Sequence, residues 1–172
     1  MKFQTVPWHK QIWNPWCIPK HQLIAWLVAR KALLLKERLL TLGIADDPDC
    51  LLCGRGIENH VHLFQTCEYL RKIFDELAKL LGVALPATDL CQLIENGQHS
   101  QLKKGVLLCV VLAAYYHIWL QRNKARVDGC LLRPALVTSQ IMKVIKMRVG
   151  SRLKPSLPSR DVIWLSRFKL YL

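Results

Sequence analysis

The sequence predicts an all-α protein, a helical domain with an embedded knuckle of three cysteines and one histidine, followed by a long helical hairpin. Two long stretches near the C-terminus, roughly 101–126 and 133–152, carry apolar residues at helical spacing and predict the hairpin. Four residues of metal-ligand type lie within the 18 residues from 50 to 67. No stretch shows a strand-pairing pattern or an internal repeat, so helices account for the expected architecture.

The composition indicates a globular, strongly basic chain. Of its 172 residues, 52% are hydrophobic and 22% are charged, which excludes a disordered chain. Lysine and arginine number 25 against 12 acidic residues, a formal net charge of +13. This balance favours a polyanionic partner, either nucleic acid or an anionic membrane surface, and the simpler alternative is a basic solvated surface.

Cysteine usage indicates a reducing, intracellular compartment, nuclear or cytoplasmic, and not secretion. The chain has seven cysteines, an odd number, and its first ten residues contain no apolar secretory segment. Four cysteines lack ligand-like spacing and are predicted to pack in the core: Cys17, Cys91, Cys109 and Cys130. The apolar run Val106–Tyr116 has eleven residues, whereas a membrane span needs about 20, so it predicts a buried helix and no membrane contact.

The N-terminal segment is expected to be extended. Three tryptophans lie among three prolines within the first 19 residues, and prolines this dense exclude a long helix. We expect Trp8, Trp13 and Trp16 to hold this segment on the core, and stacking platforms for nucleic-acid bases are the alternative.

Two short helices should follow. Apolar spacing predicts a helix from Lys20 to about Lys31, and a second from Lys36 to Leu42 that ends at Gly43. We expect a kink between them. The next residues, Ile44–Asp47, resemble the paired-aspartate turn of polymerases, but no aromatic residue or hairpin accompanies them and Pro48 follows at once. They predict a solvated acidic loop.

A zinc knuckle is predicted directly after this loop. Cys50 and Cys53 form a C-x2-C pair, and His62 and Cys67 form an H-x4-C pair. Three thiolates and one imidazole at this range are the ligands of a tetrahedral structural site for one Zn²⁺, with His62 preferred to His60. Glycines at 54 and 56 allow the sharp turn that the loop needs. The alternative is a set of buried free cysteines near an unrelated histidine.

The remaining chain predicts helices with a short linker and a tail. An amphipathic helix should run from Cys67 to Gly82, and 83–86 should be a linker before a short helix at 90–94. The helical hairpin follows, and its helices are expected to have an apolar core of their own. In the tail, Trp164, Phe168 and Tyr171 are expected to dock on the body or on a protein partner.

The knuckle also carries a family resemblance. Glu58–Cys67 reads E-N-H-V-H-L-F-Q-T-C and resembles the E-T-x-x-H-L-F-x-x-C signature of the zinc-binding domain found C-terminal to plant non-LTR (LINE-type) reverse transcriptases. The resemblance continues at Trp8–Trp13, Ile18–His21 and Ala25–Leu27, and Ile118–Asn123 resembles the I-W-x-x-R-N run that follows this domain. The resemblance implies that, in an intact LINE-type retrotransposon, this domain would help the polymerase to hold template RNA or target DNA.

Two departures from the family pattern stand out. Asn59 replaces a threonine, which we expect to be harmless, and Leu33–Leu39 lacks the Pro-Thr pair that usually starts a helix there. With the resemblance, the chain divides into a reverse-transcriptase-type zinc-binding domain at 6–82, a helical extension at 88–154 and a C-terminal tail at 155–172.

The sequence favours a nucleic-acid-binding domain without catalytic residues. Zinc with four protein ligands leaves no open position for a reactive water, and no hydrolase or nucleotide-binding motif is present. Binding to RNA or DNA is expected through phosphates, and the candidate cations are Lys20, Arg30, Lys31, Arg71, Lys72, Arg122, Lys124, Arg126, Arg148 and Arg152. The alternative is a structural or protein-interaction module in which zinc serves folding only.

Overall fold

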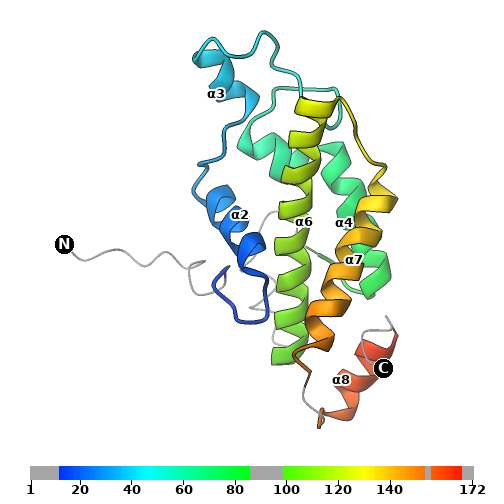
Figure 1. Ribbon diagram of the computed structural model, residues 1–172. Coiled ribbons are helices and arrows are strands. Elements are labelled where there is room, and N and C mark those ends of the chain that lie inside the picture. Colours follow the sequence, from blue (N-terminus) through cyan, green and yellow to red (C-terminus); the bar gives the residue numbers. More distant parts are fainter. Residues whose placement is uncertain (1–11, 86–98, 154–155, 168–172) are drawn as a thin grey trace, which may run out of the picture.

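The computed structural model describes residues 12–85, 99–153 and 156–167, and the elements of these ranges are helices joined by loops (Figure 1). Its elements in chain order are α2 (Pro19–Ala29), α3 (Lys36–Thr41), the π-helical turn η1 (His62–Thr66), α4 (Glu68–Leu81), α6 (Gln101–Asp128), α7 (Pro134–Gly150) and α8 (Ser159–Ser166). Within the described ranges, strand-like pairing is limited to one bridge, between Asp49 and Ile57. The predicted all-α class is therefore confirmed.

Helix α6 runs through the centre of the molecule. Each residue from 106 to 114 is at most 2% exposed, because α2 packs on one side of α6 and α7 on the other (Figure 1). By length and composition α6 could cross a membrane, but 78% of its most apolar window is buried inside the fold. It is therefore a buried helix of the core, as the sequence predicted.

The predicted helical hairpin consists of α6 and α7. The connection between them is fixed at Leu132, whose carbonyl accepts a hydrogen bond from the Tyr69 hydroxyl (2.6 Å). The backbone N–H of Leu132 donates to the Gln121 side chain (3.2 Å). Helix α4 packs against α7, so the hairpin lies against the helix that follows the knuckle.

One hydrophobic core spans the whole described part of the chain. Buried residues of the N-terminal half, such as Leu63 and Leu77, belong to the same cluster as Val110 and Val149 of the hairpin. The expectation that the later helices have a core of their own was wrong, because α2 and α4 bury their apolar faces against α6 and α7 rather than against each other. The predicted helix at 90–94 lies outside the described residues.

The segment before α2 is held by contacts with distant helices. Trp16 packs on the core, where its ring lies over Gly105 of α6. Arg148 of α7 donates to the backbone carbonyls of Pro15, Trp16 and Cys17 over 2.9–3.1 Å. The prediction for Trp16 is confirmed, whereas Trp13 is 44% exposed and Trp8 lies outside the described residues. Arg148 was predicted to contact phosphates, and this is corrected, since its donors are used inside the fold.

The free cysteines divide between core and surface. Cys17 and Cys109 are buried, with their sulfur atoms 3.0 Å apart. Cys130 is exposed after the end of α6, so the prediction that it packs in the core was wrong. Its neighbours form the connection to α7, where the chain runs along the surface. Cys91 lies outside the described residues.

The two early helices are separated by a break rather than a kink. Between α2 and α3 the chain passes through Lys31, whose φ of +51° is a left-handed conformation that non-glycine residues seldom adopt. Leu33 and Leu35 then turn into the core and are at most 6% exposed. The break thus places α3 and the following loop apart from α2, at the end of the molecule where α6 ends (Figure 1).

Helix α8 docks at the opposite end of α6. The Ser100 hydroxyl, which caps α6 by accepting from the Lys103 N–H, donates to the Asp161 carboxylate (2.6 Å). The Lys103 ammonium lies 5.4 Å from the Trp164 ring, and Trp164 packs against the core. The expected docking of the tail is confirmed for Trp164, and Phe168 and Tyr171 lie outside the described residues.

Two histidines are buried where α2 meets α6. The rings of His21 and His117 lie 6.2 Å apart, and each side chain is at most 6% exposed. Burial lowers the pKa of each from 6.5 to about 4, and the nearby positive charge of Lys20 acts in the same direction. The fold therefore contains the neutral forms of both rings.

Acidification should destabilise the protein through these two histidines. Between about pH 6.5 and pH 4 the unfolded chain binds more protons than the folded one, so the free energy of unfolding falls as the pH falls, by up to about 1.4 kcal/mol per pH unit for each histidine. In His117→Leu, the slope of the free energy of unfolding against pH should be smaller by the contribution of one histidine. Urea unfolding followed by circular dichroism at several pH values measures the difference. Zinc release at low pH affects both proteins alike, so equal slopes would contradict the assignment.

Candidate metal centre

The knuckle brings the four predicted ligands together. The ligand atoms of Cys50, Cys53, His62 and Cys67 all lie within 4.8 Å of one another. The sulfur atoms of Cys50 and Cys67 are 3.9 Å apart, and Cys53 Sγ lies 3.3 Å from His62 Nε2. In a tetrahedral zinc site, with Zn–S near 2.3 Å and Zn–N near 2.0–2.1 Å, neighbouring ligand atoms lie about 3.5–3.8 Å apart. The donor set and its spacing therefore fit one structural zinc.

The loop between the ligands turns at its glycines. Gly54 and Gly56 have φ values of +67° and +71°, in the left-handed region that glycine adopts without steric cost. The Cys50 N–H donates to the Gly56 carbonyl (2.9 Å), and the Gly54 N–H donates to the Cys50 carbonyl (2.8 Å). These two bonds close the loop, so that Cys53 is carried back towards His62.

His62 faces the thiols and His60 does not. His60 Nε2 lies 3.2 Å from the carbonyl oxygen of Leu33, and its ring packs near Phe64. The preference for His62 from the sequence agrees with this arrangement, because only the His62 ring reaches a cysteine. His60 instead joins the knuckle to the segment that precedes α3.

Asn59 starts the short helical segment that carries His62. Its side-chain oxygen accepts the His62 N–H (2.8 Å), and its carbonyl accepts the Leu63 N–H (2.9 Å). Asn59 therefore acts as the N-cap of this segment, a position at which asparagine and threonine are both common. The departure from the family pattern at this position is harmless for this reason.

Cys67 lies at the N-terminus of α4, which favours its thiolate. The pKa of Cys67 is lowered, first by the hydrogen bond with Cys50 and further by the backbone N–H groups of Leu70 and Tyr69. A helix N-terminus stabilises negative charge through such unpaired N–H groups. The start of α4 thus supports one metal ligand electrostatically, and η1 brings His62 to the same place.

Glu58 is a central residue of the site. No structural role was predicted for it from the sequence. Its side chain is fully buried and accepts from Arg122 of α6 through Nε (2.9 Å) and Nη2 (2.7 Å). It also accepts the backbone N–H of Leu51, inside the knuckle (3.3 Å), and that of Lys36, the first residue of α3 (3.0 Å). One carboxylate therefore joins the knuckle, α3 and α6.

Glu58 also replaces the missing helix start before α3. No side chain from the Leu33–Leu35 run caps this helix. Instead the Glu58 carboxylate accepts the Lys36 N–H, and the Glu58 carbonyl accepts the Glu37 N–H (3.1 Å). The cap comes from 22 residues further along the chain, so the helix forms without the Pro-Thr pair.

The comparisons with known proteins agree with this geometry. The family model described as zinc-binding in reverse transcriptase matches residues 1–74. These residues are a reverse-transcriptase zinc-binding domain. Neither the comparison with curated proteins nor that with solved structures gave a match. The reverse-transcriptase zinc-binding domain holds all four metal ligands and Glu58, whereas Arg122 lies outside it.

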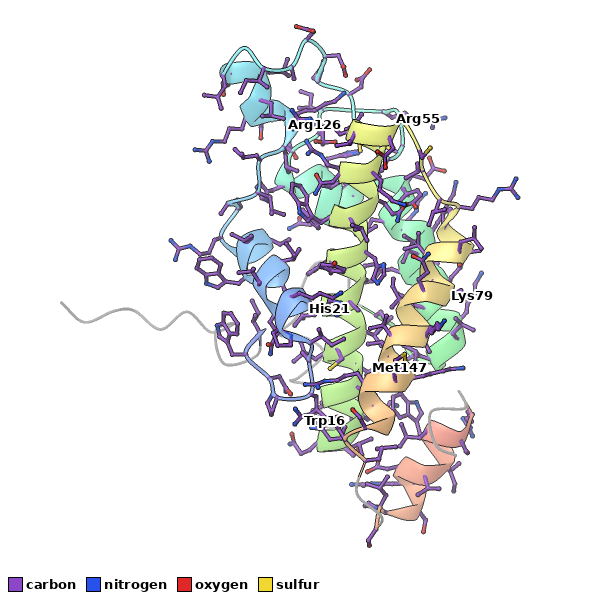
Figure 2. The ribbon with its side chains drawn as sticks, in the orientation of Figure 1. Trp16, His21, Arg55, Lys79, Arg126 and Met147 are labelled. Atoms are coloured by element: carbon purple, nitrogen blue, oxygen red, sulfur yellow. The ribbon has the colours of Figure 1, made fainter. Side chains whose placement is uncertain are left out.

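The predicted nucleic-acid-binding cations are mostly on the surface. Eight are exposed: Lys20, Arg30, Lys31, Arg71, Lys72, Lys124, Arg126 and Arg152. Arg122 is 1% exposed, and its assignment to phosphate binding is corrected, because its guanidinium is paired with Glu58. Arg55 was missed by the sequence analysis, although its side chain is 84% exposed on the knuckle. Figure 2 shows Arg55 and Arg126 at the same end of the molecule.

The acidic loop before the knuckle has a structural contact. The Asp47 carboxylate accepts from the Lys36 ammonium and from the Asp49 N–H (3.1 Å). The Lys36 hydrogen bond is the main cause that lowers the Asp47 pKa. Asp46 and Asp47 are exposed, as expected of a solvated acidic loop.

Purified protein should contain one zinc per chain. Replacement of His62 by alanine removes the imidazole nearest the thiols and should abolish stoichiometric zinc, whereas His60→Ala should retain it and lose only the contact with Leu33. Elemental analysis after gel filtration measures both. Zinc content near zero in the unmodified protein, or retention by His62→Ala with loss by His60→Ala, would refute the ligand set.

Removal of the Arg122 charge should destabilise the whole fold. Arg122→Met leaves Glu58 buried without its partner, which costs about 3–5 kcal/mol of unfolding free energy. Lys124→Met, a matched change on the exposed side of the same helix, should cost less than about 0.5 kcal/mol. Denaturant unfolding with zinc present measures both variants. A similar, small effect of the two substitutions would show that the ion pair contributes little.

Proposed function

We propose that this chain is a zinc-stabilised nucleic-acid-binding domain derived from the C-terminal part of a plant LINE-type reverse transcriptase. It acts inside the cell, in the nucleus or cytoplasm, and has no polymerase activity. The single observation that carries the proposal is the combination of a reverse-transcriptase zinc-binding domain with a net charge of +13. RNA or DNA is the partner, bound through its phosphates.

The distribution of the exposed cations supports binding to phosphates with little sequence preference. They lie on and directly after α2, on α4, at the end of α6 and in the turn after α7, rather than on one helix that could enter a groove. Lysines and arginines spread in this way neutralise phosphates and release counterions, whereas base readout needs a few side chains fixed against base edges. We therefore expect affinity to depend on salt more than on sequence.

The chemistry of the metal centre supports a role without catalysis. Its four protein ligands fill a tetrahedral zinc, so no position remains for a water that zinc could activate. In the acidic loop, Asp47 is engaged by Lys36. Two-metal polymerase chemistry needs paired carboxylates on a rigid scaffold, and this loop is a poor source of them.

Measurement of affinity at several salt concentrations tests the proposal. Zinc-loaded protein should bind mixed-sequence RNA and DNA of 20 nucleotides at low salt, and the logarithm of the association constant should fall linearly with the logarithm of salt concentration. The double variant Lys124→Gln and Arg126→Gln keeps the buried Arg122. It should weaken binding to every sequence about equally and reduce the slope by roughly 1–2. Fluorescence anisotropy provides both quantities.

Two results would overturn this function. One is the absence of binding at low salt, and the other is an affinity that stays constant between low and high salt, since salt screens charge and not apolar docking. Correct folding of the double variant is checked by its zinc content and its thermal unfolding.

A protein-interaction module is the second candidate, and a groove favours it. The groove lies between α4 and α7 and has a volume of about 640 Å³; Leu80, Ala135 and Met142 form the apolar part of its lining, and polar and charged side chains form the rest. The Thr138 hydroxyl, which also lines it, is buried without a hydrogen-bond partner. A protein docking there, or on the C-terminal aromatic residues, would persist at high salt, which separates this function from the first.

A further inference from the structure

We propose that the outer face of α2, together with Tyr116 of α6, binds single-stranded nucleic acid by stacking bases on its aromatic rings. This inference rests on the proposed function and specifies the form of nucleic acid and the surface that takes it. We call this surface the α2 face; its binding residues are Trp13, Lys20, Trp26, Arg30, Lys31 and Tyr116, and Leu23 lies beside them without a ring or a charge.

The helical spacing places the α2 residues on one outward side. His21, Gln22 and Ala25 are buried against the rest of the fold, which fixes the orientation of the helix. Figure 2 shows His21 between α2 and α6. Lys20, Leu23, Trp26 and Arg30 follow at steps of three and four residues and therefore share the opposite side. Leu23 is 49% exposed, and Lys20 and Arg30 are exposed. The face is open to a ligand.

Cations and aromatic rings are paired on this face. The Lys20 ammonium lies 4.9 Å from the centroid of the Tyr116 ring, and the Arg30 guanidinium carbon lies 5.3 Å from the centroid of Trp26. Tyr116 and Trp26 are half-buried, so the fold holds each ring in place while part of each side chain stays exposed. The Tyr116 ring also packs against the His21 ring, with 4.7 Å between the centroids. A base stacked on such a ring has its own phosphate within reach of the adjacent cation. This combination is that of single-strand binding surfaces.

Trp13 is a further exposed ring, on the segment that leads into α2. It is 44% exposed, and the next residue, Asn14, is tied to α2 because its carbonyl accepts from the Gln22 side chain (2.7 Å). Arg148 holds the following three residues through their carbonyls. Trp13 is thus an exposed aromatic side chain on an anchored segment, and its exposure does not come from a loose chain.

The charge and chemistry of the face favour a single strand over a duplex. In a duplex the base faces are stacked inside the helix, so aromatic rings on the protein surface gain nothing from it, whereas phosphates are available in both forms. Helix α2 contains no acidic residue that would repel phosphates. Aromatic substitutions should therefore separate the two forms of nucleic acid, and charge substitutions should not.

The test compares a 20-nucleotide mixed-sequence single strand, as RNA and as DNA, with a 20-base-pair duplex of the same sequence, all at one low salt concentration. Trp26→Ala and Trp13→Ala should each weaken single-strand binding about tenfold and leave duplex binding within about twofold. Leu23→Ala, a matched loss of apolar surface without a ring on the same face, should leave both unchanged. The triple variant Lys20→Gln, Arg30→Gln and Lys31→Gln should weaken both forms.

Tryptophan fluorescence separates a loss of base stacking from a loss of folding in the variants. Single strands should quench tryptophan fluorescence of the unmodified protein, and Trp26→Phe, which keeps an aromatic ring, should retain most of the affinity while reducing the quenching. Equal effects of the tryptophan variants on single strand and duplex, or none on either, would overturn the stacking face and leave phosphate binding intact. Loss of binding in Leu23→Ala to the same extent as in Trp26→Ala would overturn it in favour of apolar docking of a protein. If neither form binds the unmodified protein, the proposed function fails, and this inference fails with it.

Discussion

The buried ion pair between Glu58 and Arg122 is the contact on which the rest of the structure depends. Both side chains are at most 1% exposed, and together they join residues 64 positions apart. A buried charge is tolerated only when it is paired and its hydrogen-bonding capacity is used, and both conditions are met here. The carboxylate also binds backbone N–H groups of the knuckle and of α3, so the pair determines where these two elements lie on α6.

The zinc and this ion pair have complementary effects on the same loop. The metal fixes four side chains within one short segment, which orders the loop internally. It does not orient the loop relative to the helices, and Glu58, His60 and Tyr69 do so by binding Arg122, the Leu33 carbonyl and the Leu132 carbonyl. A metal site and a helical core are thereby combined into one folding unit, in which neither part has an apolar core of its own.

Much of the fold and the metal centre could be predicted because their signals are local. The helices follow from apolar spacing, and the four ligands are close in sequence, so even the preference for His62 over His60 agrees with the structure. Arg122 and Arg148 could not be interpreted correctly in this way. Their sequence neighbourhoods resemble exposed basic segments, and only the three-dimensional fold brings Glu58, or the carbonyls of residues 15–17, to their guanidinium groups. The structural role of Glu58 could not be predicted either, since its partners come from other segments.

The unbroken length of α6 has a consequence for the way any extended ligand is held. With 28 residues at about 1.5 Å per residue, the helix is a rod of about 42 Å. Tyr116 and the cations at 124 and 126 belong to this rod, so the separation between the proposed stacking site and the proposed phosphate site is set by helix geometry rather than by a loop. The position of a bound strand along the protein would then be set by the fixed distance between these sites on a rigid helix, as well as by charge.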